Sequence, residues 1–432
     1  MHSKTRWPYF LAGLLAFALV AAACGGDSDP TTTTAAPSGG DSTTAAPSGG
    51  APEDFKIGIL LVGPGNDRGY SQAHLEGAEY AIEKLGLSVD DNLIVLEFAN
   101  LGDTPGLSFP GTAREMVDLG ADLIIFNSDD MRDGAFEAAA ALPEVPMIWV
   151  SGDSAWADGK DYKPELTNLA NVWGKMIYGK MIAGCAAALE TETGKLAYLG
   201  PLTNDETRRL VNSSYLGAKY CWENIRGEDP ADLEFTVTYI GFWFEVPGVT
   251  LDATLVVNDF IDGGADVILS GIDANVALIR SGQRADAGEN VSAIPYDYVG
   301  ACDEAPDICL GVPYFNWGPA YLEAANAVIG GSFEADWKWY EPNWADINDP
   351  DSSVVGFFQG NGLSAENAAS LDTFIAGLAD GSIELYEGPL NWQDGSQFLS
   401  DGQVATDFDI WYSPQCLEGI EGSCSDFNAL AG

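Results

Sequence analysis

Two stretches of the sequence, GADLIIFNSD (residues 120–129) and GADVILSGID (residues 264–273), share one pattern. In each, a glycine ends a helical segment, a short apolar run follows, and an aspartate comes after the run. Continuous apolar runs are typical of strands buried on both faces of a parallel sheet covered by helices. Ligands of open α/β sheets bind at the carboxyl ends of the strands, so Asp129 and Asp273 are candidate ligand-binding residues. A turn-forming or helix-capping role is the alternative for each aspartate.

The same alternation extends along the chain from Phe55 onward. Stretches of helical period separate short runs rich in Ile, Val and Leu. The runs are KIGILLVG, LIVLEFAN, DLIIFNS and PMIWVSG in the first half, then KLAYLG, EFTVTYIG, DVILSG and AIPYDYVG in the second. Two series of about four strands each predict an α/β protein with two doubly wound parallel-sheet lobes, and therefore a cleft between them.

The N-terminal region has the pattern of an export signal. A short basic head with Lys4 and Arg6 precedes an apolar stretch, which ends in small residues before Cys24. The apolar stretch is shorter than the roughly 20 residues that span a membrane. Residues 21–24 resemble the lipobox of bacterial lipoproteins, which implies a signal peptide at 1–23 and lipidation of Cys24. Residues 24–52 contain a near repeat of TTAAPSGG and no bulky apolar side chain, so we expect a disordered tether.

The cysteine count agrees with export. Besides Cys24 the chain has six cysteines, which allow 15 connectivities. Proximity favours the pairs Cys185–Cys221, Cys302–Cys309 and Cys416–Cys424. A metal site would need thiolates clustered with histidine. The only histidines are His2 and His74, so we expect neither a metal nor another cofactor.

The charge of the chain is strongly acidic. Without residues 1–23, 17 basic residues oppose 65 acidic ones. Repulsion excludes nucleic acid as a partner. We interpret the excess of acidic residues as a solvated surface adapted to salt rather than as a binding feature.

A glycine-rich loop, GPGNDRGYSQAHLEG (residues 63–77), joins the first predicted strand to a helix. Such loops often hold phosphate at a helix N-terminus. This one lacks both Gly-Lys-Ser/Thr and G-x-G-x-x-G, and an acid stands beside Arg68. We therefore expect the loop to present Asn66, Asp67 and Tyr70 to a polar, uncharged ligand.

The chain resembles the basic membrane protein family, whose members are substrate-binding lipoproteins of ABC importers. The resemblance covers nearly the whole region after the tether, and its motifs occur in the family's order. They are GPGNDRGY with Glu76-Gly77, ANVWGKMIYGKMIAG, GFWFEVPGVTLDATLVVNDFIDGGADVIL, FNWGPAYLEAANAVIGGSF, LADGSIELYEGPL and FLSDGQVATDFDIWYSPQCLEGIEG. The resemblance implies a hinge and a fold like that of type I periplasmic binding proteins. It places residues 53–165 and 311–336 in lobe 1, and residues 166–310 and 337–432 in lobe 2.

The resemblance also implies a purine nucleoside or free purine as ligand. Aromatic side chains stack on a purine ring, and carboxylates accept hydrogen bonds from ribose hydroxyls or ring N–H groups. The residues that match the family's binding positions are Asp67, Tyr70, Trp243, Asp273, Asn316 and Trp317. For the two tryptophans, packing in the core or hinge is the alternative.

The sequence therefore predicts a monomeric receptor, held outside a bacterial membrane by its lipid, that closes on a ligand and delivers it to an ABC permease. A sugar or amino acid is the alternative ligand, although an amino acid would need an arginine for its carboxylate; Arg68, Arg132 and Arg280 are available. A ligand-sensing receptor without a permease is a further alternative. An enzyme is not expected, because the chain lacks G-x-S-x-G and His74 has no evident nucleophile beside it.

Overall fold

The computed structural model describes residues 50–100 and 102–430. The predicted signal peptide, Cys24 and most of the predicted tether lie outside these residues. Within the described part of the chain, no helix combines the length and the apolar character needed to cross a membrane.

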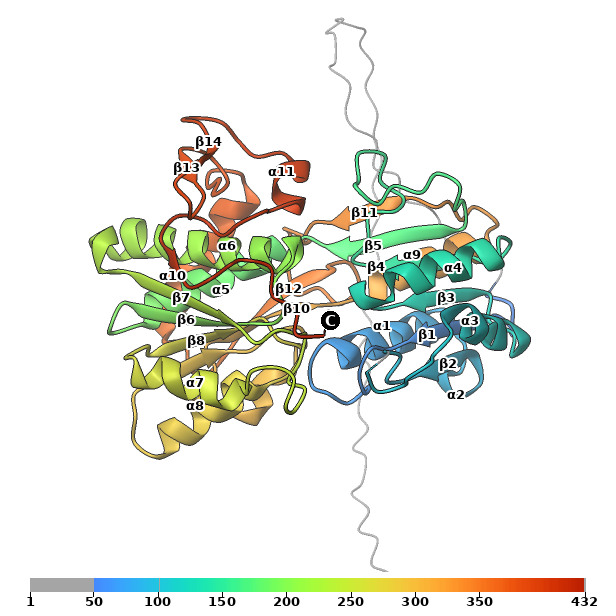
Figure 1. Cartoon of the computed structure of the whole chain (residues 1–432), viewed down its shortest axis with the longest axis horizontal. Helices are drawn as coiled ribbons and strands as arrows, with labels where there is room; N and C mark the ends of the chain where they lie inside the picture. Colours follow the sequence, from blue (N-terminus) through green and yellow to red (C-terminus); the bar gives the residue numbers. More distant parts are fainter. Residues whose placement is uncertain (1–49, 101, 431–432) are drawn as a thin grey trace, which may run out of the picture. The chain divides into compact units, whose positions relative to one another are not determined.

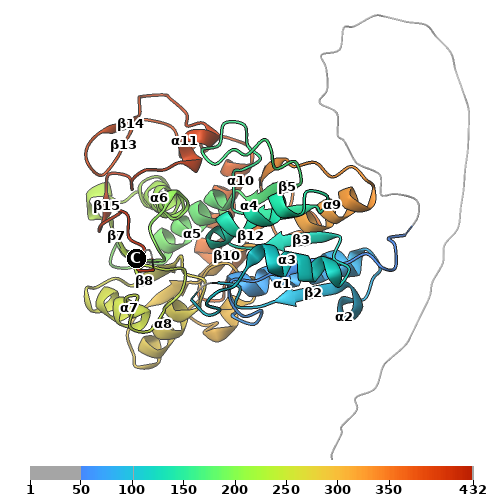
Figure 2. The same cartoon turned by 45° about the vertical axis from the view of Figure 1, so that its right-hand side comes forward.

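The first lobe is built on a six-stranded parallel sheet with the order β11-β5-β4-β3-β1-β2 (Figure 1). Its strands are β1 (Ile57–Leu60), β2 (Leu93–Leu96), β3 (Leu123–Phe126), β4 (Met147–Val150), β5 (Leu169–Gly174) and β11 (Trp337–Tyr340). β1, β3 and β4 are buried at every position, as their continuous apolar runs predict. Its helices are α1 (Tyr70–Lys84), α2 (Val89–Asn92), α3 (Phe109–Asp118), α4 (Arg132–Ala141) and α9 (Gly318–Ile329). α1 packs against α9, and α3 packs against α4 (Figure 2).

The second lobe is built on a five-stranded parallel sheet with the order β15-β7-β6-β8-β9. Its strands are β6 (Lys195–Gly200), β7 (Glu234–Tyr239), β8 (Val267–Ser270), β9 (Ser292–Ile294) and β15 (Ile420–Glu421). Its helices are α5 (Met176–Glu190), α6 (Asp205–Tyr220), α7 (Ala253–Asp262), α8 (Val276–Asp286), α10 (Ala365–Ala379) and α11 (Asp407–Trp411). Two antiparallel pairs complete the fold: β10 (Gly311–Phe315) with β12 (Val355–Gln359), and β13 (Leu390–Asn391) with β14 (Gln397–Leu399). Two separate parallel sheets confirm the predicted fold class.

The chain crosses between the lobes after β5, after β10 and after β11. These crossings differ from the predicted boundaries. Residues 169–174 and 337–340 pair within the first sheet, although the predicted boundaries place them in lobe 2. Conversely, residues 311–315 pair with β12 and bridge to Asp297, although the predicted boundaries place them in lobe 1. A crossing strand is apolar whichever sheet it joins, so its sequence does not reveal its partner.

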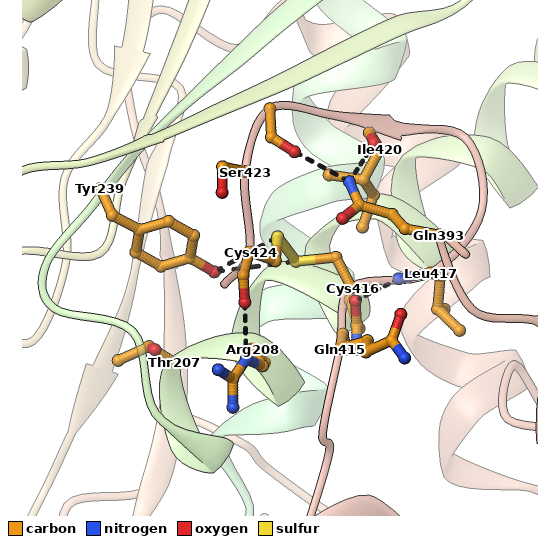
Figure 3. The surroundings of a disulfide bond; sticks show 12 residues. Thr207, Arg208, Tyr239, Gln393, Gln415, Cys416, Leu417, Ile420, Ser423 and Cys424 are labelled. Carbon is orange, nitrogen blue, oxygen red and sulfur yellow. Dashed lines mark hydrogen bonds between the residues drawn. A yellow bond between two sulfur atoms is a disulfide. The ribbon is translucent and has the colours of Figure 1, made fainter. Parts of the chain in front are cut away.

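Three disulfides link the predicted cysteine pairs: Cys185–Cys221, Cys302–Cys309 and Cys416–Cys424. Figure 3 shows the last of these, which closes a loop of the C-terminal segment. The Arg208 side chain on α6 donates to the Cys424 carbonyl at 3.0 Å. The Leu417 N–H donates to the side-chain oxygen of Asn212, also on α6, at 2.9 Å. The C-terminal segment is therefore fixed to the second lobe.

Candidate functional site

A cavity between the lobes is lined by residues at the carboxyl ends of parallel strands from both sheets and by residues of α6. From the first lobe come Tyr70, Ser128, Asp129, Ser151 and Trp173. From the second lobe come Tyr198, Pro201, Glu206, Thr207, Leu210, Trp243, Gly271, Asp273, Tyr296 and Asp297. Strand ends are the positions where open α/β sheets bind ligands.

The lobes stand close together in this structure. The cavity has a volume of about 20 Å³, which is room for about one water molecule. A ligand larger than water therefore requires the two walls to move apart, and the three crossings between the lobes provide the hinge for such a movement.

The second lobe contributes the carboxylates of Asp297, Asp273 and Glu206 to the cavity wall. Asp297, just after β9, is fully buried, and neither of its carboxylate oxygens has a hydrogen-bond partner of normal geometry among the described residues. Burial raises the pKa of Asp297 well above its usual value, and nearby Lys180 only partly opposes this effect. Burial also raises the pKa of Asp273, with the charge of Asp297 adding to it. The pKa of Glu206, on α6, is raised by burial to about 7.

Lys180 does not line the cavity, but it contacts the segments that contribute these carboxylates. It lies on α5 and is 1 % exposed, and its Nζ donates to the Ser270 carbonyl at 2.7 Å. The same Nζ stands 3.3 Å from the centre of the Tyr296 ring. Burial lowers the pKa of Lys180 to about 7. Lys180 thus ties the end of β8 to the segment after β9, which precede Asp273 and Asp297 respectively.

Aromatic side chains form much of the remaining wall: Tyr70, Trp173, Tyr198, Trp243 and Tyr296. The Tyr70 hydroxyl donates to the Asn127 carbonyl at 2.6 Å, which fixes its ring at the start of α1. The Trp243 carbonyl accepts from the Asp273 N–H at 2.9 Å, which holds these two wall residues together. Aromatic faces beside carboxylate acceptors suit a planar ligand that carries N–H or O–H donors.

Four of the eight predicted ligand-binding residues line this cavity: Tyr70, Asp129, Trp243 and Asp273. The other four, Asn66, Asp67, Asn316 and Trp317, are not among its lining residues. Asn66 is exposed. Asn316 donates to the carbonyls of Pro350 and Ser353 at 2.9 and 2.8 Å, so it joins two of the segments that cross between the lobes. Trp317 is fully buried and stacks on His74 with ring centres 4.4 Å apart, the packing role considered above as its alternative.

Asp67 explains why the glycine-rich loop is not arranged to hold phosphate. Its carboxylate accepts from the backbone N–H groups of Gly69, Ser71 and Gln72 at 2.8, 2.9 and 3.0 Å. These donors belong to the first turn of α1, where a bound anion would otherwise sit. The chain's own carboxylate therefore occupies the anion position.

Several lining residues were missed by the sequence analysis. Asp297 lies within the stretch AIPYDYVG, which the sequence analysis predicts as a strand. An acid after a short apolar run, the pattern that singles out Asp129 and Asp273, could also have identified Asp297. Ser128, Ser151 and Trp173 also stand at strand ends, but their residue types carry no specific signal. Glu206 lies in the first turn of α6 and has no strand-end signal at all.

Comparison with known proteins finds similar sequences and similar folds. No family model matches. A purine-binding protein of Brucella abortus (strain 2308) is 24% identical over 359 residues, which cover 83% of this chain and 90% of that protein. A metabotropic glutamate receptor-like protein (protein F) of Dictyostelium discoideum is 25% identical over 312 residues, which are 72% of this chain but 36% of the receptor.

Two solved structures of ABC transporter solute-binding proteins are similar over most of the chain. The one from Conexibacter woesei has a TM-score of 0.54 at 16% identity, covering 76% of this chain and 97% of its own. The one from Aeropyrum pernix has a TM-score of 0.58 at 13% identity, covering 78% and 92%. The fold is that of the periplasmic binding proteins.

Proposed function

We propose that this protein is the extracytoplasmic substrate-binding component of an ABC importer, related to the basic membrane protein family, and that its cavity closes on a purine nucleoside or purine base. The observation that carries the proposal is a cavity whose walls come from both lobes and combine aromatic rings with carboxylate acceptors. The purine-binding relative, matched over 90% of its length, supports the choice of ligand.

Closure follows from the placement of the two walls. A ligand that touches Tyr70 and Asp129 on one lobe and Trp243 and Asp273 on the other interacts more strongly with the closed form than with the open form. Such a difference in affinity is what shifts a hinge equilibrium toward closure. The carboxylates accept hydrogen bonds from the ring N–H groups or ribose hydroxyls, and the aromatic rings pack on the base.

The proposal includes the way in which the receptor is held at the membrane. Lipidation of Cys24 and a tether up to residue 52 would hold the receptor, as a monomer, beside its permease. Binding and release of an unchanged solute, rather than catalysis, is the activity we assign. A different small solute, such as a sugar, is the alternative ligand.

The experiment is calorimetric titration of the purified protein with adenosine, guanosine, inosine and adenine. Asp273→Asn and Trp243→Ala should each weaken the binding that the wild type shows. Losing a charged acceptor from a desolvated site costs about 2–5 kcal/mol, so Asp273→Asn should weaken binding by roughly 30-fold or more. Asp122→Asn is the control, because Asp122 is exposed and precedes β3, at the end of its strand away from the cavity.

Absence of wild-type binding to all four compounds at millimolar concentration would overturn the purine assignment. Purine binding that neither Asp273→Asn nor Trp243→Ala weakens would overturn the assignment of this cavity as the site. Mass spectrometry of solutes released from the denatured protein is an independent check on the ligand's class.

A further inference from the structure

A groove between the lobes adjoins the cavity and is far roomier. Its volume is about 430 Å³. Asp129, Ser151 and Glu206 line both the groove and the cavity, so the two are continuous. The first lobe also contributes Trp149, Asp153, Lys160 and Asp161, and the second lobe Thr203, Asn204, Asp205, Arg208, Arg209, Trp411, Tyr412 and Asp426.

Arg209 is the unusual residue of the groove. It is 2 % exposed, its Nη1 donates to the Trp411 carbonyl at 3.1 Å, and its guanidinium lies 4.4 Å from the centre of a Trp411 ring. Its Nε and Nη2 are buried and have no hydrogen-bond partner among the described residues. Leaving charged donors unpaired in a buried position is costly, so an acceptor supplied from outside would be bound favourably.

The neighbouring Arg208 shows the contrast. Its Nε donates to the Cys424 carbonyl at 3.0 Å (Figure 3), and its Nη1 contacts Asp205 at 3.4 Å. Its Nη2 donates to Asp426. All three nitrogens of Arg208 are therefore engaged within the chain, whereas Nε and Nη2 of Arg209 have no acceptor among the described residues and can donate to a ligand.

We propose that this groove is a second ligand subsite, in which Arg209 binds the carboxylate of an aromatic solute. Nε and Nη2 form one edge of the planar guanidinium, and two N–H groups on one edge match the two oxygens of a carboxylate. Trp149, Trp411 and Tyr412 supply aromatic walls for the rest of such a solute. The subsite does not depend on purine binding in the cavity.

The charges of the groove select a single negative charge over a double one. Burial raises the pKa of Asp129 to about 6 and that of Glu206 to about 7, so near neutral pH these two side chains carry less than full negative charge. The other acids, Asp153, Asp161, Asp205 and Asp426, repel a phosphate dianion. Lys160 is already paired with Asp205 at 3.2 Å.

The test uses benzoate as the probe, titrated into the purified protein by calorimetry, with benzyl alcohol and inorganic phosphate as comparison compounds. Benzoate should bind, and Arg209→Lys should weaken its binding at least tenfold, because a lysine cannot form the two parallel hydrogen bonds. Arg226→Lys is the matched control and should leave benzoate binding within twofold, because Arg226 does not line the groove and its Nη1 donates to the carbonyls of Ala188 and Thr191 at 2.9 and 2.6 Å. Benzyl alcohol and phosphate should bind more weakly than benzoate.

A second measurement does not rely on a folded variant. In the wild type, the side-chain Nε–Hε NMR resonance of Arg209 should shift on saturation with benzoate and stay in place with benzyl alcohol. No benzoate binding at tens of millimolar, equal losses in Arg209→Lys and Arg226→Lys, or an unmoved Arg209 resonance would each overturn the proposal. Each result is independent of whether purines bind in the cavity.

Discussion

Asp67 and Asp297 are both carboxylates in loops that follow a strand of a parallel sheet, one in each lobe, yet their environments are opposite. The Asp67 carboxylate accepts from three backbone N–H groups of its own helix. The Asp297 carboxylate is more deeply buried and has no partner of normal geometry among the described residues. An acid at a strand end is therefore a structural residue when local backbone donors face it, and a ligand-binding candidate when none does.

The loop that contains Asp67 also decides how closely the lobes approach. Gly69, two residues later, faces the backbone of Asp273 in the other lobe, and a Cβ at position 69 would lie 1.9 Å from the Asp273 carbonyl oxygen. Real Cβ atoms do not approach oxygen so closely, so the closed arrangement requires glycine here.

The largest effect is expected from Gly69→Ala. The added methyl group should prevent full closure and weaken ligand binding by about 100-fold or more, which corresponds to about 3 kcal/mol. The melting temperature of the ligand-free protein should change little, because with the lobes apart the methyl group is free of the Asp273 carbonyl. Calorimetric titration, together with small-angle X-ray scattering with and without ligand, measures both affinity and closure.

Gly50→Ala is the control for this change, since no atom lies within 4 Å of a Cβ at that position. Wild-type affinity and closure in Gly69→Ala would show that the lobes do not need the contact seen here.

Smaller effects are expected on the unfolding free energy when Asp67 or Asp297 is replaced, and the two effects should have opposite signs. Asp67→Ala removes the acceptor at the start of α1 and should lower the unfolding free energy by about 1–2 kcal/mol. Burial raises the pKa of Asp297 above its ordinary 3.8, so the folded protein holds this proton more tightly than the unfolded chain does. The unfolding free energy therefore falls as pH rises above about 4, and Asp297→Asn should reduce that loss.

Melting curves of the ligand-free proteins at pH 5 and pH 8 test this contrast. At pH 8, Asp297→Asn should melt above the wild type and Asp67→Ala below it, and the gain in Asp297→Asn should shrink at pH 5. If Asp297→Asn melted below the wild type at both values, the carboxylate would have a stabilising partner and would not be a free acceptor.

The same contrast explains what the sequence could predict. The two GAD stretches predicted that Asp129 and Asp273 lie at strand ends. A run of apolar residues followed by an acid is a local pattern, so it can be recognised in the sequence alone. The roles of Asp67 and Trp317 depend on which groups their side chains meet, and neither the α1 N–H groups nor His74 is marked in the sequence as their partner. Glu206 and Arg209 line the cleft because of the orientation of α6 about its own axis. Tertiary packing in the second lobe fixes that orientation, so a local sequence pattern does not reveal it.

The smallest effect is expected from Arg68→Ala, between Asp67 and Gly69. Arg68 reaches across the closed cleft to Glu304 at 3.1 Å and Asp303 at 3.6 Å, and its side chain is 44% exposed. Exposed ion pairs contribute up to about 1 kcal/mol, so ligand affinity should fall by no more than about fivefold. Lys338→Ala is the matched control, because the Lys338–Glu323 pair, at 2.8 Å, lies within the first lobe and should not affect closure. The Arg68 effect should disappear at about 1 M salt, where the screening length is about 3 Å. A loss of tenfold or more that persists at high salt would mean that Arg68 holds the lobes together by more than charge, and that the glycine-rich loop contributes to closure through its side chains as well as through the backbone at Gly69.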